Sequence, residues 1–474
     1  MLFTQQVFFI FLIIVFSTYW IIPKHKLILK NILLLISSYV FYGWWDWRFL
    51  SLIFISSLCD YFLALKIQSY ENKTSKKIFL YLSLFINLGL LITFKYFNFF
   101  IYNAESLLTS LGLQANLPSL KIILPVGISF YTFQTLSYTI DVYRGNLKPT
   151  KSIINFFAFV SFFPQLVAGP IERASHLLPQ FSKMKSFCFK NFEDGCRIAL
   201  WGFFKKVVVA DNCATIANHA FENYQSLSGL ALFIGMIAFS FQIYGDFSGY
   251  SDIAIGISRM FGFSLMRNFK SPYLSRDIAE FWRRWHISLS TWFRDYLYIP
   301  LGGSRLGKWQ SVRNTFIIFL VSGFWHGANW TFIFWGLIHA LLFLPLLLLE
   351  KNRNNTEDNI KLIHLPKIIS TYIIVCFAWV FFRAESMNIA LNFILRMFEL
   401  KTNIQVFNPY VLLISTTSIL IVLSSEFITQ KYESPLIYMK KQTNTVMRWG
   451  AYIILVNASL IFQGKMQEFI YFQF

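Results

Sequence analysis

Apolar residues run along the chain in blocks that are long enough to cross a membrane as helices. An α-helix rises 1.5 Å per residue, so about 20 apolar residues span ~30 Å of hydrocarbon. The predicted spans cover residues 4–22, 31–47, 49–66, 78–100, 122–140, 153–170, 229–245, 314–349, 367–382, 409–426 and 449–463. The run 314–349 is too long for one span, so the pattern predicts about ten to twelve membrane helices.

The composition indicates the same class of protein. Of the 474 residues, 56% are hydrophobic, 19% are aromatic and 14% are charged. A soluble core cannot bury that much apolar surface. The chain contains no internal repeat and no separate polar domain. We therefore predict an all-α, polytopic membrane protein with one domain over residues 1–474.

Basic residues in the short loops predict the orientation. They gather in the first, third and fifth loops, and cytoplasmic loops usually carry such an excess. The N-terminus is therefore predicted to be extracytoplasmic. The net charge of +19 predicts contact of the basic loops with anionic membrane lipids, and it does not require a nucleic-acid partner. Strict alternation would place the basic stretch 183–197 outside. Either "FFPQLVAGP" (162–170) is re-entrant or residues 171–210 lie partly in the interface, and such a break suggests a funnel.

The stretch "AEFWRRWHISLSTWFRDYLYIPLGG" (279–303) predicts an amphipathic helix over 279–297. Its apolar face consists of Ile278, Phe281, Trp282, Trp285, Leu289, Trp292, Phe293 and Tyr296. Its charged face consists of Arg276, Asp277, Glu280, Arg283, Arg284, Arg294 and Asp295. His286 lies at the boundary between the two faces. A basic, Trp-rich helix is typical of a membrane interface, so a lipid anchor and a functional site remain alternatives.

A second histidine, His326, lies within the apolar run "FLVSGFWHGANWTFIFWGLIHALLFLPLLLLE" (319–350). Gly323 and Gly327 form a small-residue face that lets a neighbouring helix approach closely. A histidine bonded across packed helices and a functional residue are both open interpretations, since an ionisable group at membrane depth needs a cavity or a partner. His339 would point away from His326 on a continuous helix, so we interpret it as structural.

Two carboxylates, Asp246 and Asp252, follow the apolar run at 229–245 in "QIYGDFSGYSDIAIG" (242–256). They could orient a histidine, bind a cation or cap helices, and capping is the role that we favour. The five cysteines are widely separated, with no C-x-x-C motif and no His/Cys pair at metal spacing. They predict neither a disulfide framework nor a metal site.

Four blocks together resemble those of the membrane-bound O-acyltransferase family, in the bacterial branch of alginate O-acetylases and D-alanyl transfer proteins. They are "FFPQLVAGPIERASHLLPQF" (162–181), "QIYGDFSGYSDIAIG", "FWRRWHISLSTWFRDYLYIPLGGSR" (281–305) and "SGFWHGANWTFIFWGLIHA" (322–340). The blocks keep the order of the family over residues 122–383. The resemblance implies a ring of helices around a central funnel, with re-entrant and interfacial helices.

The resemblance also implies an activity, a site and partners. His326 would be the catalytic base and His286 a second site residue. The predicted substrate-binding residues are Arg283, Arg284, Asp246, Asp252, Asn329 and Trp325. The acyl donor would be a cytoplasmic thioester such as acetyl-CoA, and the protein would hold no bound cofactor. The acceptor would be a cell-envelope polysaccharide, and an extracytoplasmic SGNH-type acetyltransferase would be the partner that completes the transfer. The alternatives are D-alanyl transfer to teichoic acid, and a transporter or flippase of a lipid-linked glycan or acyl carrier.

Overall fold

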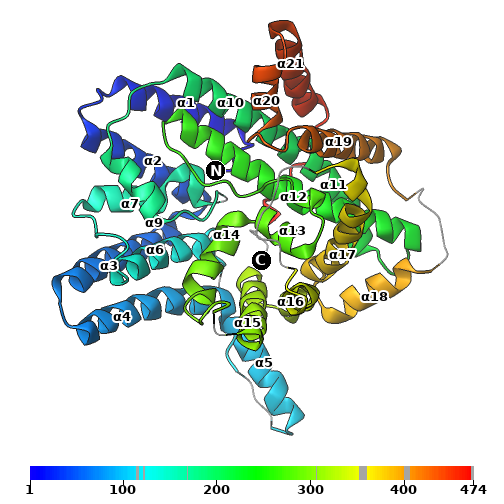
Figure 1. Ribbon diagram of the computed structural model, residues 1–474, viewed down its shortest axis with the longest axis horizontal. Coiled ribbons are helices and arrows are strands. Elements are labelled where there is room, and N and C mark those ends of the chain that lie inside the picture. The colour runs from blue at the N-terminus through cyan, green and yellow to red at the C-terminus, as the bar shows by residue number, and fades with distance from the viewer. Residues whose placement is uncertain are drawn as a thin grey trace. The chain divides into compact units, whose positions relative to one another are not determined.

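The computed structural model describes residues 1–113, 117–120, 123–167, 169–305, 307–351, 360–399 and 406–470. Within these ranges every regular element is a helix and none is a strand (Figure 1), which confirms the predicted all-α class. The chain forms two compact units. Unit 1 comprises Met1–Phe192 and Ser258–Met266, and unit 2 comprises Glu193–Ile257 and Arg267–Phe474.

Unit 1 is a bundle of helices and short helical turns. Its elements are α1 (Gln6–Ile21), α2 (Leu27–Asp46), η1 (Trp47–Phe49), α3 (Leu50–Ser69), α4 (Lys73–Leu91), η2 (Ile92–Tyr96), α5 (Phe97–Ser110), α6 (Ile128–Tyr143), α7 (Ile153–Ser161), α8 (Phe163–Leu166), α9 (Ala174–Leu177) and η3 (Leu178–Ser182). Helices α3, α4 and α6 pack against one another, and α2 packs on α7.

A buried carboxyl group joins three helices of unit 1. Asp60 of α3 accepts hydrogen bonds from Ser83 and Asn87 of α4, at 2.5 and 2.8 Å, and from Thr139 of α6 at 3.2 Å. All four side chains are fully buried. Apolar side chains gain little by leaving lipid for another helix, so hydrogen bonds of this kind fix which helices pair and in which register.

Unit 2 contains most of the remaining helices. Its elements are α10 (Phe189–Phe203), which begins in unit 1, η4 (Phe204–Ala210), α11 (Asp211–Glu222), α12 (Gly229–Met260), which ends in unit 1, η5 (Pro272–Leu274), α13 (Ile278–Arg284), α14 (Ile287–Phe293), η6 (Arg294–Tyr298), α15 (Lys308–His326), α16 (Trp330–Leu348), η7 (Leu362–His364), α17 (Leu365–Arg383), α18 (Met387–Met397), α19 (Pro409–Ile428), α20 (Pro435–Gln442) and α21 (Thr445–Ile461). Helix α16 packs against both α15 and α17.

Six helical stretches in the described ranges are long and apolar enough to cross a membrane. They are Leu27–Ser69, Lys73–Ser110, Gly229–Met260, Trp330–Leu348, Leu362–Arg383 and Pro409–Ile428. The first two contain more than one helix each, and shorter apolar helices occur at Gln6–Ile21, Met387–Met397 and Thr445–Ile461. This supports a multi-pass membrane protein, whereas the total of ten to twelve spans stays a prediction.

Two predicted breaks in the apolar runs are present. The run 314–349 divides into α15 and α16, with residues 327–329 between them. In unit 1, α7 ends at Ser161 and α8 begins at Phe163, because Pro164 has no N–H with which to continue the preceding helix. Whether the segment after α7 is re-entrant stays a prediction.

Candidate active site

His326 is the last residue of α15, and the chain turns directly after it. Gly327 is extended, and Asn329 caps α16 by accepting a hydrogen bond from the backbone N–H of Thr331 at 3.2 Å. The side chain of His326 is buried, with 3% exposed. The imidazole is therefore at the turn of a helical hairpin, and not in the middle of one long helix.

Glycines make this hairpin tight. A Cβ atom on Gly323 would lie 2.3 Å from the carbonyl oxygen of Phe332, and one on Gly336 would lie 2.2 Å from that of Phe319. Both positions therefore require glycine for α15 and α16 to approach so closely. The predicted small-residue contact is confirmed at Gly323. Gly327 lies beyond the helix, where its α-carbon packs against the Phe332 ring.

Aromatic rings surround His326. The ring centroids of Trp325, Trp335 and Phe382 lie 4.9, 5.2 and 5.2 Å from that of His326. The His286 ring is also near, with a centroid separation of 6.5 Å. The structure thus brings together the two histidines that the sequence singled out, in an apolar enclosure.

The predicted continuous helix over 279–297 is wrong. Helix α13 ends at Arg284, Trp285 is extended, and His286 has left-handed backbone angles (φ 43°, ψ 53°) before α14 begins. The extended segment 268–270 takes over the backbone bonding at this break. The N–H of Ile287 donates to the carbonyl of Asn268 at 2.9 Å, and that of Lys270 donates to the carbonyl of Arg284 at 3.0 Å.

Asn268, which the sequence reading missed, fixes the tautomer of His286. Its Oδ1 accepts from the Ser288 N–H at 3.3 Å and from the Ser288 hydroxyl at 2.9 Å, and it lies 3.0 Å from His286 Nδ1. Since Oδ1 can only accept, Nδ1 must donate. Burial lowers the pKa of His286 to about 3, so the ring stays neutral near pH 7 and its lone pair is on Nε2.

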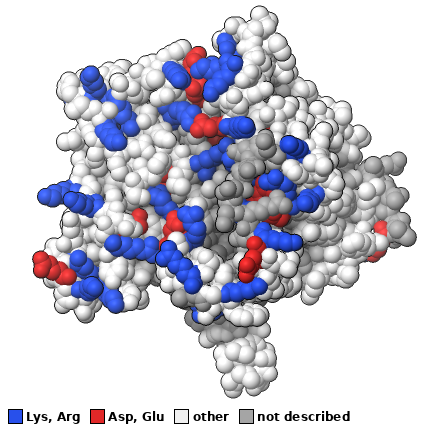
Figure 2. All heavy atoms as spheres, in the orientation of Figure 1, with Lys and Arg blue, Asp and Glu red and all other residues white. Residues whose placement is uncertain are grey.

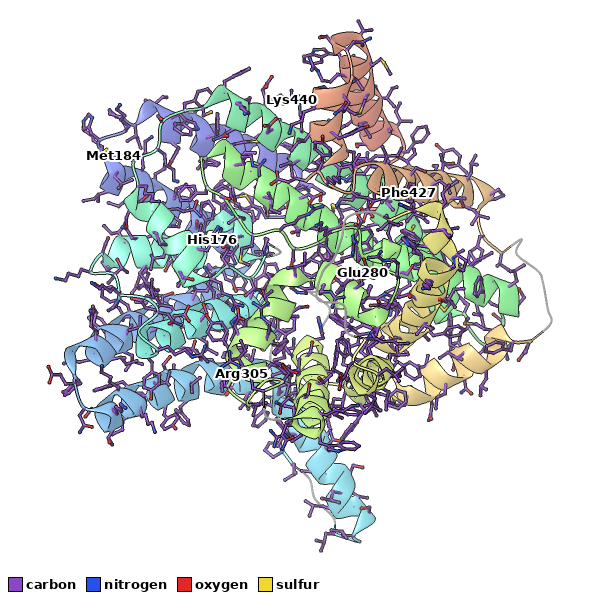
Figure 3. The ribbon with its side chains drawn as sticks, viewed as in Figure 1. His176, Met184, Glu280, Arg305, Phe427 and Lys440 are labelled. Atoms are coloured by element: carbon purple, nitrogen blue, oxygen red, sulfur yellow. The ribbon has the colours of Figure 1, made fainter. Side chains whose placement is uncertain are left out.

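The two adjacent arginines differ in role. Arg284 is buried and donates to Glu280 Oε1 at 3.0 Å, while Arg276 bonds both oxygens of Glu280 at 2.9 Å. Glu280 is labelled on α13 in Figure 3. The predicted charged face is therefore not exposed as a whole, since Arg284 and Glu280 form a buried ion pair. Arg283 is half-buried and turns into a cavity.

This cavity has a volume of about 490 Å³. Its walls are mainly apolar, and its polar lining residues are Arg283, Ser290, Thr291, Arg294, Tyr298, Thr315 and Ser322. Ser322 lies one helical turn before His326 on α15, and Trp282, another lining residue, contacts the Trp335 ring at 5.7 Å. Trp282 therefore lies between the cavity and the aromatic enclosure of His326, although neither histidine lines the cavity itself.

Lys and Arg side chains are more prominent than acidic ones on the face shown in Figure 2. In unit 2, Arg294 is exposed, with 61% of its side chain accessible, and Arg305 is exposed in the loop after η6 (Figure 3). These positions agree with a basic surface beside the cavity. An exposed basic group can contact either lipid phosphates or a phosphorylated substrate.

Asp246 and Asp252 do not cap helices, because α12 continues well past both of them. Asp246 pairs with Lys206 at 2.7 Å and accepts from the Ile470 N–H at 2.7 Å, while Asp252 pairs with Lys205 at 2.8 Å. The capping interpretation is therefore wrong. Both serve buried or half-buried ion pairs inside unit 2.

The remaining predicted residues have defined positions. Trp325 is buried and packs on both His326 and His286, with centroids at 4.9 and 6.2 Å. Asn329 caps α16 and donates to the carbonyl of Glu385 at 2.8 Å. His339 is buried and accepts from the Trp282 indole at 3.3 Å. The helical-wheel argument does not apply to His339, because α15 and α16 are separate helices, and its structural role stays a prediction.

The described residues contain no group of three His, Cys, Asp or Glu side chains that could hold a metal ion. The site offers the chemistry of two buried imidazoles, one of which has a fixed tautomer, near a cavity with basic lining residues. A neutral imidazole can accept a proton from a hydroxyl or thiol and return it to a leaving group.

This combination defines a multi-pass, all-helical membrane protein with a buried pair of histidines. A family model described as MBOAT, membrane-bound O-acyltransferase family, matches residues 39–389. The chain therefore belongs to the membrane-bound O-acyltransferase family and is an O-acyltransferase. This confirms the family that the four sequence blocks indicated.

Three curated relatives illustrate the similarity. The probable alginate O-acetylase AlgI of Pseudomonas putida is 42% identical over 401 residues, which cover 84% of this chain and 80% of that protein. The peptidoglycan O-acetyltransferase of Helicobacter pylori is 38% identical over 425 residues, 83% and 79% of the two chains. The teichoic acid D-alanyltransferase of Bacillus subtilis is 29% identical over 287 residues, 57% and 72%.

The role of Asn268 leads to a testable prediction. Replacing Asn268 by Ala removes the acceptor that holds the Nδ1–H of His286, so we expect kcat for acyl transfer to fall about 100-fold with KM little changed. Replacing Asn268 by Asp keeps the acceptor and adds a negative charge, which should raise the pKa of His286. The acidic limb of its pH–rate profile should then move to higher pH. Equal kcat and pH profiles in all three proteins would contradict the positioning role.

Proposed function

We propose that this protein transfers an acetyl group from a cytoplasmic thioester such as acetyl-CoA toward hydroxyl groups of a cell-envelope polysaccharide, either peptidoglycan or an alginate-like polymer. The observation that carries the proposal is the His286–His326 pair, which aromatic rings enclose and which lies near a cavity with basic lining residues. The similarity to alginate and peptidoglycan O-acetylating proteins supports acetyl as the group and a polysaccharide as the acceptor.

His326 acts as the general base in this proposal. It accepts the proton of an acceptor hydroxyl while the hydroxyl oxygen attacks the thioester carbonyl carbon, so a C–O bond forms and the C–S bond breaks. The proton then passes to the thiolate, which leaves as free CoA. The rings of Trp325, Trp335 and Phe382 exclude water, which would otherwise hydrolyse the thioester. His286 Nε2 provides a second, neutral acceptor beside the reacting groups.

The cavity is the proposed donor site. Its apolar walls suit the slender thioester arm, and Arg283 and Arg294 suit the phosphates at the other end of the donor. Arg284 has no part in this contact, because it is paired with Glu280 in the interior. Asp246, Asp252 and Asn329 support the fold around the site, and Trp325 contacts the transferred group.

We place the protein in the inner membrane with an extracytoplasmic N-terminus, as the distribution of basic loops indicates. Its partners are membrane lipids and an extracytoplasmic SGNH-type acetyltransferase that completes delivery to the glycan. No nucleic acid or resident cofactor takes part. D-alanyl transfer is the second candidate, which the similarity to a teichoic acid D-alanyltransferase favours.

The experiment uses the purified full-length protein in detergent. With labelled acetyl-CoA and an acceptor glycan or the SGNH-type partner, we expect acceptor-dependent release of CoA. Raising the salt from 0.1 to 1 M shortens the Debye length from ~10 to ~3 Å and should raise KM for acetyl-CoA. Arg283→Ala and Arg294→Ala should raise KM in the same direction, while Lys26→Ala, an exposed lysine in unit 1, is the matched control.

Other outcomes would exclude this function. Release that occurs with a D-alanyl thioester and not with acetyl-CoA would establish D-alanyl transfer. Background release with either donor, together with movement of a glycan or acyl carrier across proteoliposomes, would show a transporter. Unchanged KM in both arginine variants would show that the donor does not bind in the cavity, and it would not contradict the proposed reaction.

A further inference from the structure

The segment Phe462–Ile470, here called the return segment, follows α21 and enters the interior of unit 2. Hydrogen bonds to residues far away in the sequence hold its backbone. They include Asn212 Nδ2 to the Phe462 carbonyl at 2.9 Å, Gly464 N–H to the Val207 carbonyl at 2.9 Å, Lys206 Nζ to the Gln467 carbonyl at 3.1 Å, and Ile470 N–H to Asp246 Oδ2 at 2.7 Å. The side chains of Phe469 and Ile470 are buried, with 0% and 2% exposed.

A buried charge cluster anchors this segment. Lys206 lies 2.7 Å from Asp246 and 2.8 Å from Asp211, and all three side chains are at most 4% exposed. Burial alone would lower the pKa of Lys206, but the two carboxylates outweigh burial and raise it, so the lysine stays charged. Two carboxylates need more donors than one ammonium group supplies. The Ile470 N–H is one of these donors, so the return segment completes the cluster.

Close backbone contact fixes the course of the segment. A Cβ atom on Gly464 would lie 2.5 Å from the backbone carbon of Asp211 and 2.6 Å from the nitrogen of Asn212. No side chain fits there, so glycine is needed for the segment to cross the start of α11. The segment is therefore packed as part of the core of unit 2.

The return segment contacts the candidate active site through one aromatic ring. Phe469 packs against Phe247 and Tyr250, three residues apart on α12, with centroids at 5.8 and 4.7 Å. Phe247 also packs against His286, whose ring it meets nearly at right angles with centroids 4.6 Å apart. Phe469, Phe247 and His286 thus form a continuous series of contacts.

This series of ring contacts restricts the orientation of the His286 ring, which the hydrogen bond with Asn268 does not fix by itself. One bond at Nδ1 sets the tautomer and one point of the imidazole, yet the terminal χ2 torsion of histidine has a broad energy minimum. The Phe247 ring, which packs nearly at right angles against the imidazole, limits the tilt of His286, and Phe469 packs against Phe247 in turn and limits its movement. An empty space behind Phe247 would let both rings reorient.

We propose that the return segment is a positioning element of the acyl-transfer site, and that Phe469, acting through Phe247, sets the orientation of the His286 ring. This inference rests on the proposed function of the histidine pair. It gives Lys206, Asp211 and Asp246 a definite role, which is to hold the segment that carries Phe469.

The test compares three variants of the full chain. Phe469→Ala empties the contact, and we expect kcat for CoA release to fall about 10- to 100-fold per folded molecule, with KM for acetyl-CoA within about two-fold of the wild type. Phe469→Leu refills much of the space and should recover most of kcat. Met466→Ala is the matched control, because that side chain lies in the same segment and is 64% exposed, and it should leave kcat unchanged.

A second measurement does not depend on turnover. Because His286 is fully buried, diethyl pyrocarbonate should modify it slowly in the wild type, and Phe469→Ala should speed this modification at least about ten-fold, as measured by mass spectrometry of His286 peptides. Wild-type kcat and reactivity in folded Phe469→Ala would overturn the inference. A wild type that fails to release CoA, with His286 nevertheless exposed by Phe469→Ala, would refute the proposed function and leave the structural contact intact.

Discussion

The variant His326→Ala is expected to insert and fold normally and to lose acyl transfer almost completely. General acid–base catalysis contributes typically ~10²–10⁴-fold, and no other base is held at the turn between α15 and α16 within the described residues. The measurement is CoA release by the purified protein and O-acetylation of the envelope glycan in cells. Folding should be preserved, since alanine is tolerated at the end of a helix and the Trp325 and Trp335 rings can partly close the space.

Two further variants make this prediction specific. His326→Gln keeps a hydrogen-bonding side chain that cannot take up a proton at neutral pH, so it should fail as alanine does. His25→Ala, at an exposed histidine in unit 1, should keep full activity. Acetylation close to the wild-type level in His326→Ala would assign the base to another residue, and His286 would then be the first to examine.

Hydrophobic patterns sufficed to predict the helical class and several element bounds. The division of the run 314–349 followed from its length alone, and α17 and α19 lie close to the predicted spans 367–382 and 409–426. The length of α12 could not be predicted from the apolar run at 229–245, because the helix continues to Met260. Asp246 and Asp252 interrupt the apolar pattern without ending the helix, because Lys206 and Lys205 neutralise them from a distant part of the sequence.

Only part of the candidate site could be predicted, because some of its contacts join residues that are distant in the sequence. His326 and His286 were found because an ionisable ring in an apolar context is unusual, and the structure places their rings 6.5 Å apart. The break at His286 was missed, since the hydrogen bonds that replace the helical ones come from Asn268 and Lys270, outside any local periodicity. The one available signal was an asparagine in a short non-helical stretch shortly before a histidine, which many unrelated loops share.

Helical periodicity also fails to distinguish Arg283 from Arg284. Both lie on the charged side of a helical wheel, but three-dimensional packing directs Arg283 into the cavity and Arg284 against Glu280. Glu280 also bonds Arg276, so one carboxylate serves two guanidinium groups. Periodicity identifies a face of a helix, whereas the partner of each side chain depends on elements that are distant in sequence. Substitutions at these adjacent positions should therefore have different kinds of effect.

The largest expected loss of stability follows from Glu280→Ala. This change leaves Arg284 charged and buried without its carboxylate, and removing one partner of a buried ion pair costs about 3–5 kcal/mol. Hydrogen bonds from Arg276 outweigh burial and lower the pKa of Glu280. Its contribution to stability should therefore be present above the unfolded-state pKa of about 4.3 and be lost as the pH falls through the lower folded-state value. Denaturation of the purified protein in detergent, at several pH values, measures both effects.

Paired substitutions decide whether the loss comes from the unpaired charge. Glu280→Leu combined with Arg284→Met replaces the ion pair by apolar side chains of similar volume, and it should recover most of the stability that Glu280→Ala loses. Arg283→Ala should change stability by less than about 0.5 kcal/mol, because this side chain is half-buried at the cavity, and it should instead raise KM for the donor. A double variant as unstable as Glu280→Ala would show that Glu280 acts through Arg276 and not through Arg284. The two arginines differ because one faces the cavity and the other the core, and this difference sets which measurement responds to each substitution.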